Sequence, residues 1–175
     1  YASSFRKTSI GTSAAAPAEL KAVETPVSRE TDPQPSGPTP VVKIISGGQT
    51  GADRGGLEAG KELGIETGGL APKNWRTEKG KDTSLKDLGL EQDTSWSYPP
   101  RTRKNVASAD GTVIFGNASE TGSKLTSKIA RELNKPVILN PTATQLKQWL
   151  IDNNIKILNV AGNRESKNVG LQKKV

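Results

Sequence analysis

The sequence predicts an α/β domain in which about five mostly parallel strands lie between two layers of helices. The alternation of two kinds of segment supports this fold class. Short apolar runs rich in β-branched residues alternate along the chain with longer segments in which apolar residues recur every three or four positions. Strands that alternate with helices form parallel sheets, because each helix crosses back over the sheet before the next strand begins.

The first elements of this pattern begin at residue 41. Residues 41–45 are mostly Val and Ile and predict a strand. A glycine-rich run over 47–56 follows and opens a predicted helix over 54–63, and residues 65–71 predict a second strand. The polar residues 72–99 show no periodicity. We expect them to form a long loop, a kind of segment that is often functional in compact domains.

The second half of the pattern alternates more regularly. Leu125, Ile129 and Leu133 recur at four-residue spacing, which is typical of an amphipathic helix. Gly162 is expected to end the last strand. In order, the expected elements are a helix over 101–109, a strand over 112–115, a helix over 122–134, a strand over 136–139, a helix over 142–153 and a strand over 155–160.

The chain divides at residue 40. Residues 1–40 hold six of the eleven prolines, four acidic and four basic side chains, and few large apolar residues. Such a segment cannot bury enough apolar surface to offset the entropy of ordering it, so we expect an extended or disordered tail. Residues 41–175 then form one domain of ordinary size. The chain begins with Tyr1, as expected if a targeting peptide has been removed in a mitochondrion or plastid; a shortened chain explains it equally.

Composition excludes several kinds of chemistry. The chain has no Cys and no His, so Ser-His-Asp triads, Cys-His dyads and His-ligated zinc are impossible. No apolar run reaches the roughly 18 residues of a transmembrane helix. Residues 41–175 carry the whole net charge of +7, with 21 basic and 14 acidic side chains. This charge favours an anionic partner such as a nucleotide, a phosphate or RNA; scattered lysines that only keep the protein soluble are the alternative.

The clearest motif is SGGQTGADRGG over residues 46–56, between the first predicted strand and the first predicted helix. Glycines let the backbone turn tightly and approach a ligand, and amides at a helix start bind anions. The spacing matches neither a Walker P-loop nor the dinucleotide-binding glycine pattern, so a tight structural turn is the alternative. Asp53 has two interpretations. It caps the helix by accepting from the amides that follow, or it orients a ligand or acts as an acid or base.

A second polar motif surrounds the strand predicted over 112–115. Residues 110–112 precede this strand, and residues 120–126 lead into the next helix. Loops at the carboxyl ends of parallel strands meet at one edge of the sheet, so we expect 120–126 to face the same ligand as the glycine-rich loop. Ordinary capping of the helix by Thr121 or Ser123 is the alternative.

Basic and aromatic residues supply further candidates. Residues 98–106 hold three basic side chains within four positions, and arginine suits bidentate contact with phosphate; a solvated helix start is equally compatible. Arg164 follows the last strand and either faces the ligand or forms an exposed pair with Glu165. Trp75 and Trp96 lie in the polar segment. We expect them to pack in a small core, with stacking on a base or pterin ring as the alternative.

Six short motifs occur in one order along the chain: IISGGQTGADRG, APKNWR, RTRKNV, DGTVIF, TGSKLT and LNVAGNRES. Over about residues 43–166 this set resembles the molybdenum-carrier family, a circularly permuted branch of the Rossmann-like SLOG superfamily. The resemblance implies a Rossmann-like three-layer sandwich. It also implies a homo-oligomer that binds a nucleotide or the molybdenum cofactor, a pterin phosphate.

The resemblance and the motifs together define a candidate site. The chain departs from the family pattern at Ala71, where the family favours Cys, at Ser123, where it favours Gly, and at Asn163, where it favours Pro. Asp53 is also the candidate catalytic residue, and no metal ligand is expected. The candidate ligand- or phosphate-binding residues are Gly47, Gly48, Gln49, Thr50, Gly51, Asp53, Arg101, Asn105, Gly111, Thr112, Gly122, Ser123, Thr126 and Arg164.

Three functions are compatible with these observations. The first is a non-catalytic protein that binds a phosphate-bearing nucleotide or pterin at its glycine-rich loops. The second is an accessory subunit of a large organellar assembly, such as a mitochondrial ribosome, in which residues 1–40 contact RNA or protein subunits. The third is a hydrolase of a nucleotide or ribosyl phosphate. Its general base would be Asp53, Glu120 or Glu165, since the chain has no His.

Overall fold

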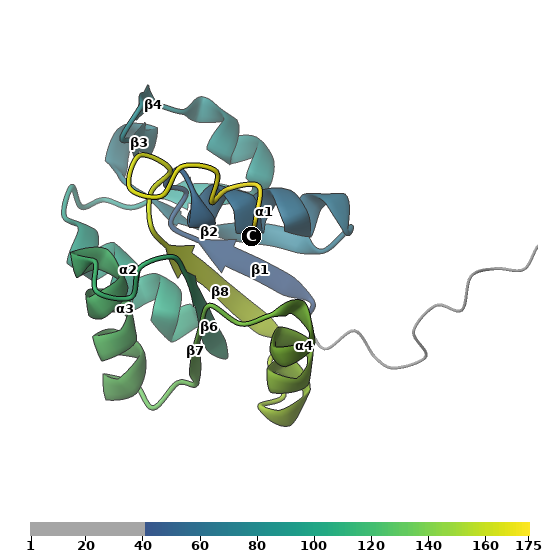
Figure 1. Ribbon diagram of the computed structural model, residues 1–175. Coiled ribbons are helices and arrows are strands. Elements are labelled where there is room, and N and C mark those ends of the chain that lie inside the picture. Colours follow the sequence, from purple (N-terminus) through teal and green to yellow (C-terminus); the bar gives the residue numbers. More distant parts are fainter. Residues whose placement is uncertain (1–40) are drawn as a thin grey trace, which may run out of the picture. The chain divides into compact units, whose positions relative to one another are not determined.

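The computed structural model describes residues 41–175, which form a three-layer α/β structure around one parallel sheet (Figure 1). The sheet has six strands in the order β5-β2-β1-β8-β6-β7, and every neighbouring pair is parallel. This confirms the predicted fold class. The strands are β1 (Lys43–Ser46), β2 (Glu66–Ala71), β5 (Leu90–Gln92), β6 (Gly111–Phe115), β7 (Val137–Leu139) and β8 (Ile157–Gly162).

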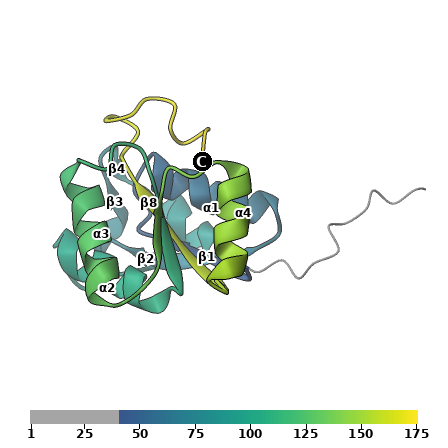
Figure 2. The ribbon, with the colours of Figure 1, turned by 60° about the horizontal axis from the view of Figure 1, so that its bottom comes forward.

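Helices cover both faces of the sheet (Figure 2). On one face, Trp149 of α4 packs with Ile44 and Val113 of the sheet. On the other face, Val106 of α2 packs against Ile129 of α3. The four helices are α1 (Ala52–Glu62), α2 (Tyr98–Ser108), α3 (Thr121–Glu132) and α4 (Ala143–Asp152).

Local sequence explains where the helices begin. Thr142 and Gln145 form a capping box at the start of α4, in which each side chain accepts a hydrogen bond from the other's backbone amide. Two prolines occupy the first turn of α2, where their missing amide hydrogens are not needed. Because of them α2 begins at Tyr98, three residues before the expected start at 101.

The segment over 72–99 differs from the expected long loop. It contains two short 3-10 helices, η1 (Lys73–Trp75) and η2 (Thr83–Leu88), and a hairpin of β3 (Arg76–Thr77) and β4 (Gly80–Lys81). It also supplies β5, which makes the sheet six-stranded where about five strands were expected. Leu85, Leu88 and Leu90 from this segment form a core cluster with Leu57 of α1. Elements this short carry no periodicity, so tertiary contacts define them.

Other boundaries differ by a few residues. The strand expected to stop before Gly162 continues through it, because the backbone of Phe115 in β6 pairs with Gly162. Residues 1–40, predicted to be an extended or disordered tail, lie outside the described residues, and the division at residue 40 stays a prediction.

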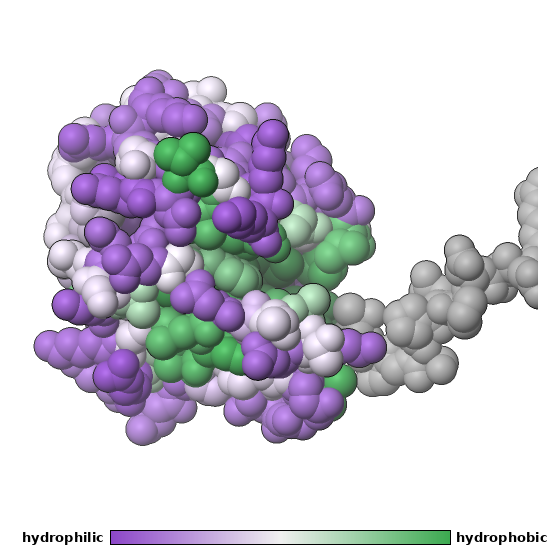
Figure 3. All heavy atoms as spheres, viewed as in Figure 1, coloured by the Kyte–Doolittle hydropathy of each residue, from purple (hydrophilic) through white to green (hydrophobic). Residues whose placement is uncertain are grey.

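The visible surface of residues 41–175 is mostly hydrophilic, with small apolar patches (Figure 3). The exposed large apolar side chains include Leu63, Leu139 and Ile151. Among the described residues, none of the helices is long and apolar enough to cross a membrane.

Two helical glycines give a matched test of this packing. A Cβ added at Gly56 in α1 would lie 2.5 Å from Cγ1 of Val160, whereas a Cβ at Gly122 in α3 would meet nothing within 4 Å. We expect Gly56→Ala to destabilise the fold by about 1–3 kcal/mol through overpacking, despite the higher helix propensity of alanine. We expect Gly122→Ala to stabilise it by about 0.5–1 kcal/mol. Urea denaturation of both variants measures this, and equal effects would contradict the close packing of α1 on β8.

Candidate functional site

A cavity of about 350 Å³ opens at the carboxyl ends of β1 and β8, beside the first turns of α1, α2 and α3. This is the edge at which ligands bind in open α/β sheets. Eight of the fourteen candidate residues line it: Gly47, Gln49, Asp53, Arg101, Asn105, Gly122, Thr126 and Arg164.

The floor of the cavity is built around Gly47. A Cβ at this position would lie 2.9 Å from Oδ2 of Asp53 and 3.2 Å from Cζ of Arg101, so no larger residue fits between the two charged groups. Nη1 of Arg101 donates to the Gly47 carbonyl over 3.0 Å, and Oδ2 of Asp53 accepts from the Gln49 amide over 3.1 Å. The glycine-rich loop is therefore held by one carboxylate from α1 and one guanidinium from α2.

Asp53 does not cap its helix. Gly51 is the N-cap of α1, and no side chain bonds to the first turn. The Asp53 side chain is buried instead, and burial raises its pKa to about 6 against the opposing charge of Arg101 and the Gln49 hydrogen bond. A carboxyl that titrates near pH 6 inside a cavity is typical of functional sites.

Two arginines bring positive charge to the cavity. Arg101 is buried, and burial lowers its pKa while the nearby Asp53 carboxylate opposes this shift. Arg164 is half-buried. The two guanidinium carbons lie 5.0 and 5.3 Å from the ring centroid of Tyr98, within cation–π range. Both arginines and the tyrosine line the same cavity.

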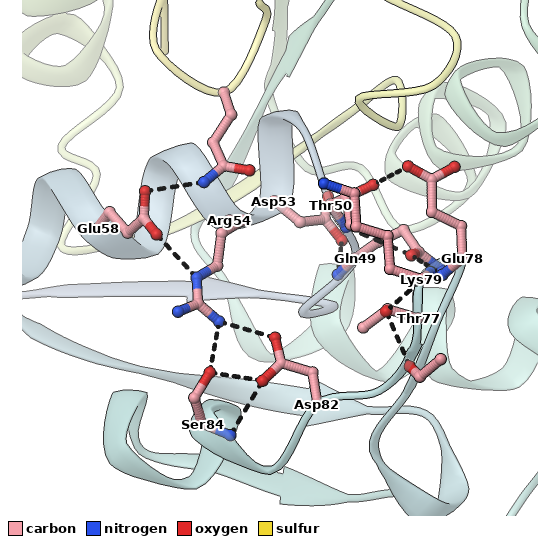
Figure 4. Close-up of polar contacts among 12 residues, drawn as sticks. Gln49, Thr50, Asp53, Arg54, Glu58, Thr77, Glu78, Lys79, Asp82 and Ser84 are labelled. Atoms are coloured by element: carbon pink, nitrogen blue, oxygen red, sulfur yellow. Dashed lines mark hydrogen bonds and ion pairs between the residues drawn. The ribbon is translucent and has the colours of Figure 1, made fainter. Parts of the chain in front are cut away.

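Two of the buried donors at this cavity have no hydrogen-bond partner among the described residues: Nε2 of Gln49 and Nε of Arg101. Oε1 of Gln49 accepts from the Glu78 amide over 2.8 Å and from the Thr50 amide over 3.3 Å, which fixes the orientation of the Gln49 side-chain amide (Figure 4). Buried polar groups are almost always paired in folded proteins. These two nitrogen atoms are therefore suited to donate to an acceptor on a bound molecule.

Asn105 lines the cavity but has a structural task. Its Oδ1 accepts from the Leu70 amide over 2.9 Å, and its Nδ2 donates to the Leu70 carbonyl over 3.2 Å. It thus joins α2 to β2. The Thr126 hydroxyl likewise donates to the Gly122 carbonyl over 2.9 Å, within α3.

Three candidates of the glycine-rich loop lie behind the cavity wall. A Cβ at Gly48 would meet Leu90, so this glycine packs against the core. Gly51 has a positive φ, and a Cβ there would lie 2.3 Å from the carbonyl oxygen of Asn163. The hydroxyl of Thr50 donates to the Glu78 carboxylate. These residues shape the loop.

Three candidates of the second motif also lie away from the cavity. Gly111 and Thr112 occupy the amino end of β6, opposite the edge where the cavity opens, because their motif precedes the strand. The Thr112 hydroxyl accepts from Nδ2 of Asn159 over 3.3 Å and so orients a residue that does line the cavity. Ser123 accepts from Nδ2 of Asn163 over 3.4 Å.

The structure does not support two of the alternative interpretations of these motifs. Neither Thr121 nor Ser123 caps α3, whose N-cap is Glu120. Glu165 accepts from the amides of Gly170 and Gln172, and no ion pair joins it to Arg164 in the described part of the chain.

The two tryptophans of the polar segment have different environments. Trp75 is buried in the core cluster with Leu57, as expected. Trp96 is 55% exposed, so the expected core packing is wrong for it.

Eight lining residues are absent from the candidate list, although five of them fall in the two segments, 98–106 and 120–126, that were expected to supply ligand contacts. Asn159, Ala161 and Gly162 lie near the carboxyl end of β8, and the rule that ligands bind at this edge could have identified them. Tyr98 depends on the early start of α2, which the two prolines signalled. The remaining four are Pro99, Thr102, Thr121 and Leu125.

A three-layer parallel α/β fold with a glycine-rich loop at the carboxyl edge of its sheet defines a Rossmann-like ligand-binding protein. Comparison with known families identifies the branch: residues 44–175 match the model of the circularly permutated YpsA SLOG family. The chain belongs to this family. No curated protein matches the chain.

A solved structure agrees with this assignment. The crystal structure titled "Putative molybdenum carrier protein", from Syntrophus aciditrophicus SB, is 33% identical in sequence and superimposes with a TM-score of 0.70. The match covers 76% of this chain and 89% of the other.

The pKa of Asp53 leads to a test of this geometry. Its folded pKa of about 6 exceeds the ordinary value of 3.8, so folding favours the protonated carboxyl, and this contribution is lost as pH rises from about 4 to above 6. Asp53→Asn should therefore gain stability relative to the wild type over this range, by up to about 3 kcal/mol. Urea denaturation at several pH values measures the difference. Asp87→Asn, at an exposed carboxyl, is the control, and parallel curves for both variants would contradict the burial of Asp53.

Proposed function

We propose that this protein binds a small molecule carrying a phosphate group, a nucleotide or a pterin of the molybdenum-cofactor type, in the cavity lined by Arg101 and Arg164. The observation that carries the proposal is the pair of unpartnered buried donors, Nε of Arg101 and Nε2 of Gln49, beside a second arginine. A phosphate has acceptor oxygens for all three side chains. The first turns of three helices add partial positive charge at the same place.

The size and chemistry of the cavity fit such a ligand. About 350 Å³ lies at the lower end of the range for small-molecule sites. Arginines and amides suit the phosphate of the molybdenum cofactor, and the relative named a molybdenum carrier supports this choice. The described residues hold no group of three or more Asp or Glu side chains that could bind a metal ion, so we assign no protein ligand to molybdenum.

Arg164 gives the cleanest test of anion binding, because its side chain is half-buried and forms no hydrogen bond with the described residues, whereas its carbonyl, which Ala would keep, accepts from the amides of Lys167 and Asn168. Loss of one charge-assisted contact should weaken binding of inorganic pyrophosphate about tenfold or more in Arg164→Ala. Isothermal titration calorimetry on the full chain measures the affinity. Arg131→Ala removes the same charge from the exposed end of α3 and should bind as the wild type does. Equal affinities for the two variants would reject the cavity as the phosphate site.

One observation favours a second candidate function, hydrolysis of a nucleotide or ribosyl phosphate. Asp53 lines the cavity with a pKa of about 6, suited to a general acid or base near neutral pH. Of the other two candidate bases, Glu165 is occupied by two backbone amides and Glu120 lies outside the cavity lining.

Product release from a panel of nucleotides tests the hydrolase. If the chain is a hydrolase, turnover should follow a pH profile with an inflection near 6 and should vanish in Asp53→Asn, while Asp87→Asn keeps it. Tight binding without any turnover would leave the binding function and reject hydrolysis.

An accessory role in an organellar assembly is a separate proposal. It rests on the net charge of +7 and on residues 1–40, which lie outside the described part of the chain. Organellar location, contacts of the tail with RNA or protein subunits, and homo-oligomer formation likewise stay predictions. Co-sedimentation of the native protein with a large particle, lost when residues 1–40 are deleted, would support the assembly role.

A further inference from the structure

A second cavity of about 360 Å³ lies over the β3–β4 hairpin. Its lining includes Trp96, Asn74, Arg76, Glu78 and Lys81. Most of these side chains are polar or charged, whereas Trp96 is a large aromatic side chain left 55% exposed. Lys73 places its ammonium group 5.4 Å from the ring centroid of Trp96. An exposed indole at the mouth of a polar cavity offers a flat surface on which a planar ring can stack.

The backbone beside this cavity is strained in a way that holds its shape. Asn74 and Trp75 are consecutive residues with positive φ, 59° and 58°, and a bulky residue such as Trp75 rarely adopts this conformation. Burial of the Trp75 side chain and a 2.8 Å hydrogen bond from the Asp82 amide to its carbonyl keep the strain in place. Such strain is typical of functional sites.

Glu78 links the lining of this second cavity to that of the first. Glu78 lines the second cavity, and its amide donates to the side chain of Gln49, which lines the first (Figure 4). The Glu78 carboxylate also accepts from the hydroxyls of Thr50 and Ser166. The hairpin is thereby fastened to the two loops that carry Gln49 and Arg164.

An aromatic pair joins the two cavities on another side. Trp96 lines the second cavity and Tyr98 the first, and Ser97 between them is extended, with φ −81° and ψ 138°. Two residues span at most about 7 Å along the chain, so the backbone positions of Trp96 and Tyr98 lie close together. A molecule that places its phosphate on Arg101 and Arg164 beside Tyr98 therefore has an aromatic surface within reach.

We infer that the hairpin cavity is the ring-binding half of the same ligand site, in which a planar nitrogen heterocycle stacks on Trp96 while its phosphate lies on Arg101 and Arg164. This inference rests on the proposed phosphate-binding function and deepens it by assigning the part of the site that holds the ring. The ligand is a heterocycle joined to a phosphate, such as a purine nucleotide or a pterin phosphate. Glu78 and Asn74 supply polar groups around the ring edge.

The test compares three probes on the full chain by calorimetry: inorganic pyrophosphate, a purine nucleoside diphosphate and a phosphorylated pterin. Trp96→Ala should weaken binding of a ring-bearing probe about fivefold to a hundredfold, the range for loss of one stacked base. It should leave pyrophosphate affinity within about twofold. Trp96→Phe should restore most of the affinity. Leu63→Ala is the matched control, since Leu63 is a 74% exposed apolar residue that lines neither cavity.

Fluorescence gives a second readout. Of the three tryptophans, Trp75 is buried and Trp149 packs against the core, so ring probes should quench mainly Trp96. The quenching should disappear in Trp96→Phe while calorimetry still detects binding. Whichever ring probe loses more affinity in Trp96→Ala identifies the heterocycle.

The outcomes separate the two proposals. If the wild type binds pyrophosphate as tightly as the ring probes, or if Trp96→Ala binds all three unchanged, the ring-binding site is wrong and the phosphate site stands. If the wild type binds none of the probes, both proposals fail.

Discussion

The candidate site depends on two charged groups that are buried on either side of Gly47. Asp53 reaches the loop from α1 and Arg101 from α2, and the loop runs between them with no room for a Cβ. Each charge also bonds to the loop backbone, at the Gln49 amide and the Gly47 carbonyl. The neighbouring guanidinium limits the rise in the pKa of the buried carboxyl, and the carboxylate in turn supports the charge of the buried guanidinium. The same two side chains, Asp53 and Arg101, therefore hold the shape of the loop and set the charge of the cavity.

The β3–β4 hairpin adds a further set of contacts to the loops around the cavity. Through its amide and carboxylate, Glu78 contacts Gln49, Thr50 and Ser166, which come from both sides of the cavity. Burial alone would raise the pKa of Glu78, but the hydrogen bonds from Ser166 and Thr50 together outweigh burial and lower the pKa. A largely ionised carboxylate thus holds two ligand loops together without entering the first cavity. In the same region Arg54 of α1 pairs with Asp82, which follows β4, so the hairpin is tied to α1 as well (Figure 4).

The sequence pattern predicted those elements whose formation depends mainly on residues close together in the chain. The apolar run before the glycine-rich loop and the four-residue spacing in α3 signal their elements without tertiary help, and both were confirmed. The segment 72–99 could not be predicted in this way, because β5 has three residues and only Leu90 of these is buried. The site was predictable where a motif follows a strand, as at Asp53 and Arg164. Gly111 was misplaced because its motif precedes β6, and Trp96 was misjudged because exposure depends on packing far along the chain.

Asn163 and Ser123, two departures from the family pattern, contact each other in the structure. Asn163 donates its amide hydrogen to the Phe115 carbonyl over 3.0 Å, which a proline cannot do. Its side chain bonds both the amide and the carbonyl of Asn117, and it donates to the hydroxyl of Ser123, which a glycine lacks. Asn163 and Ser123 together therefore fasten the end of β8 to the loop between β6 and α3. Ser123 does not line the cavity, so its side chain leaves that space open, and the fastened Asn163 directly precedes Arg164, which does line it.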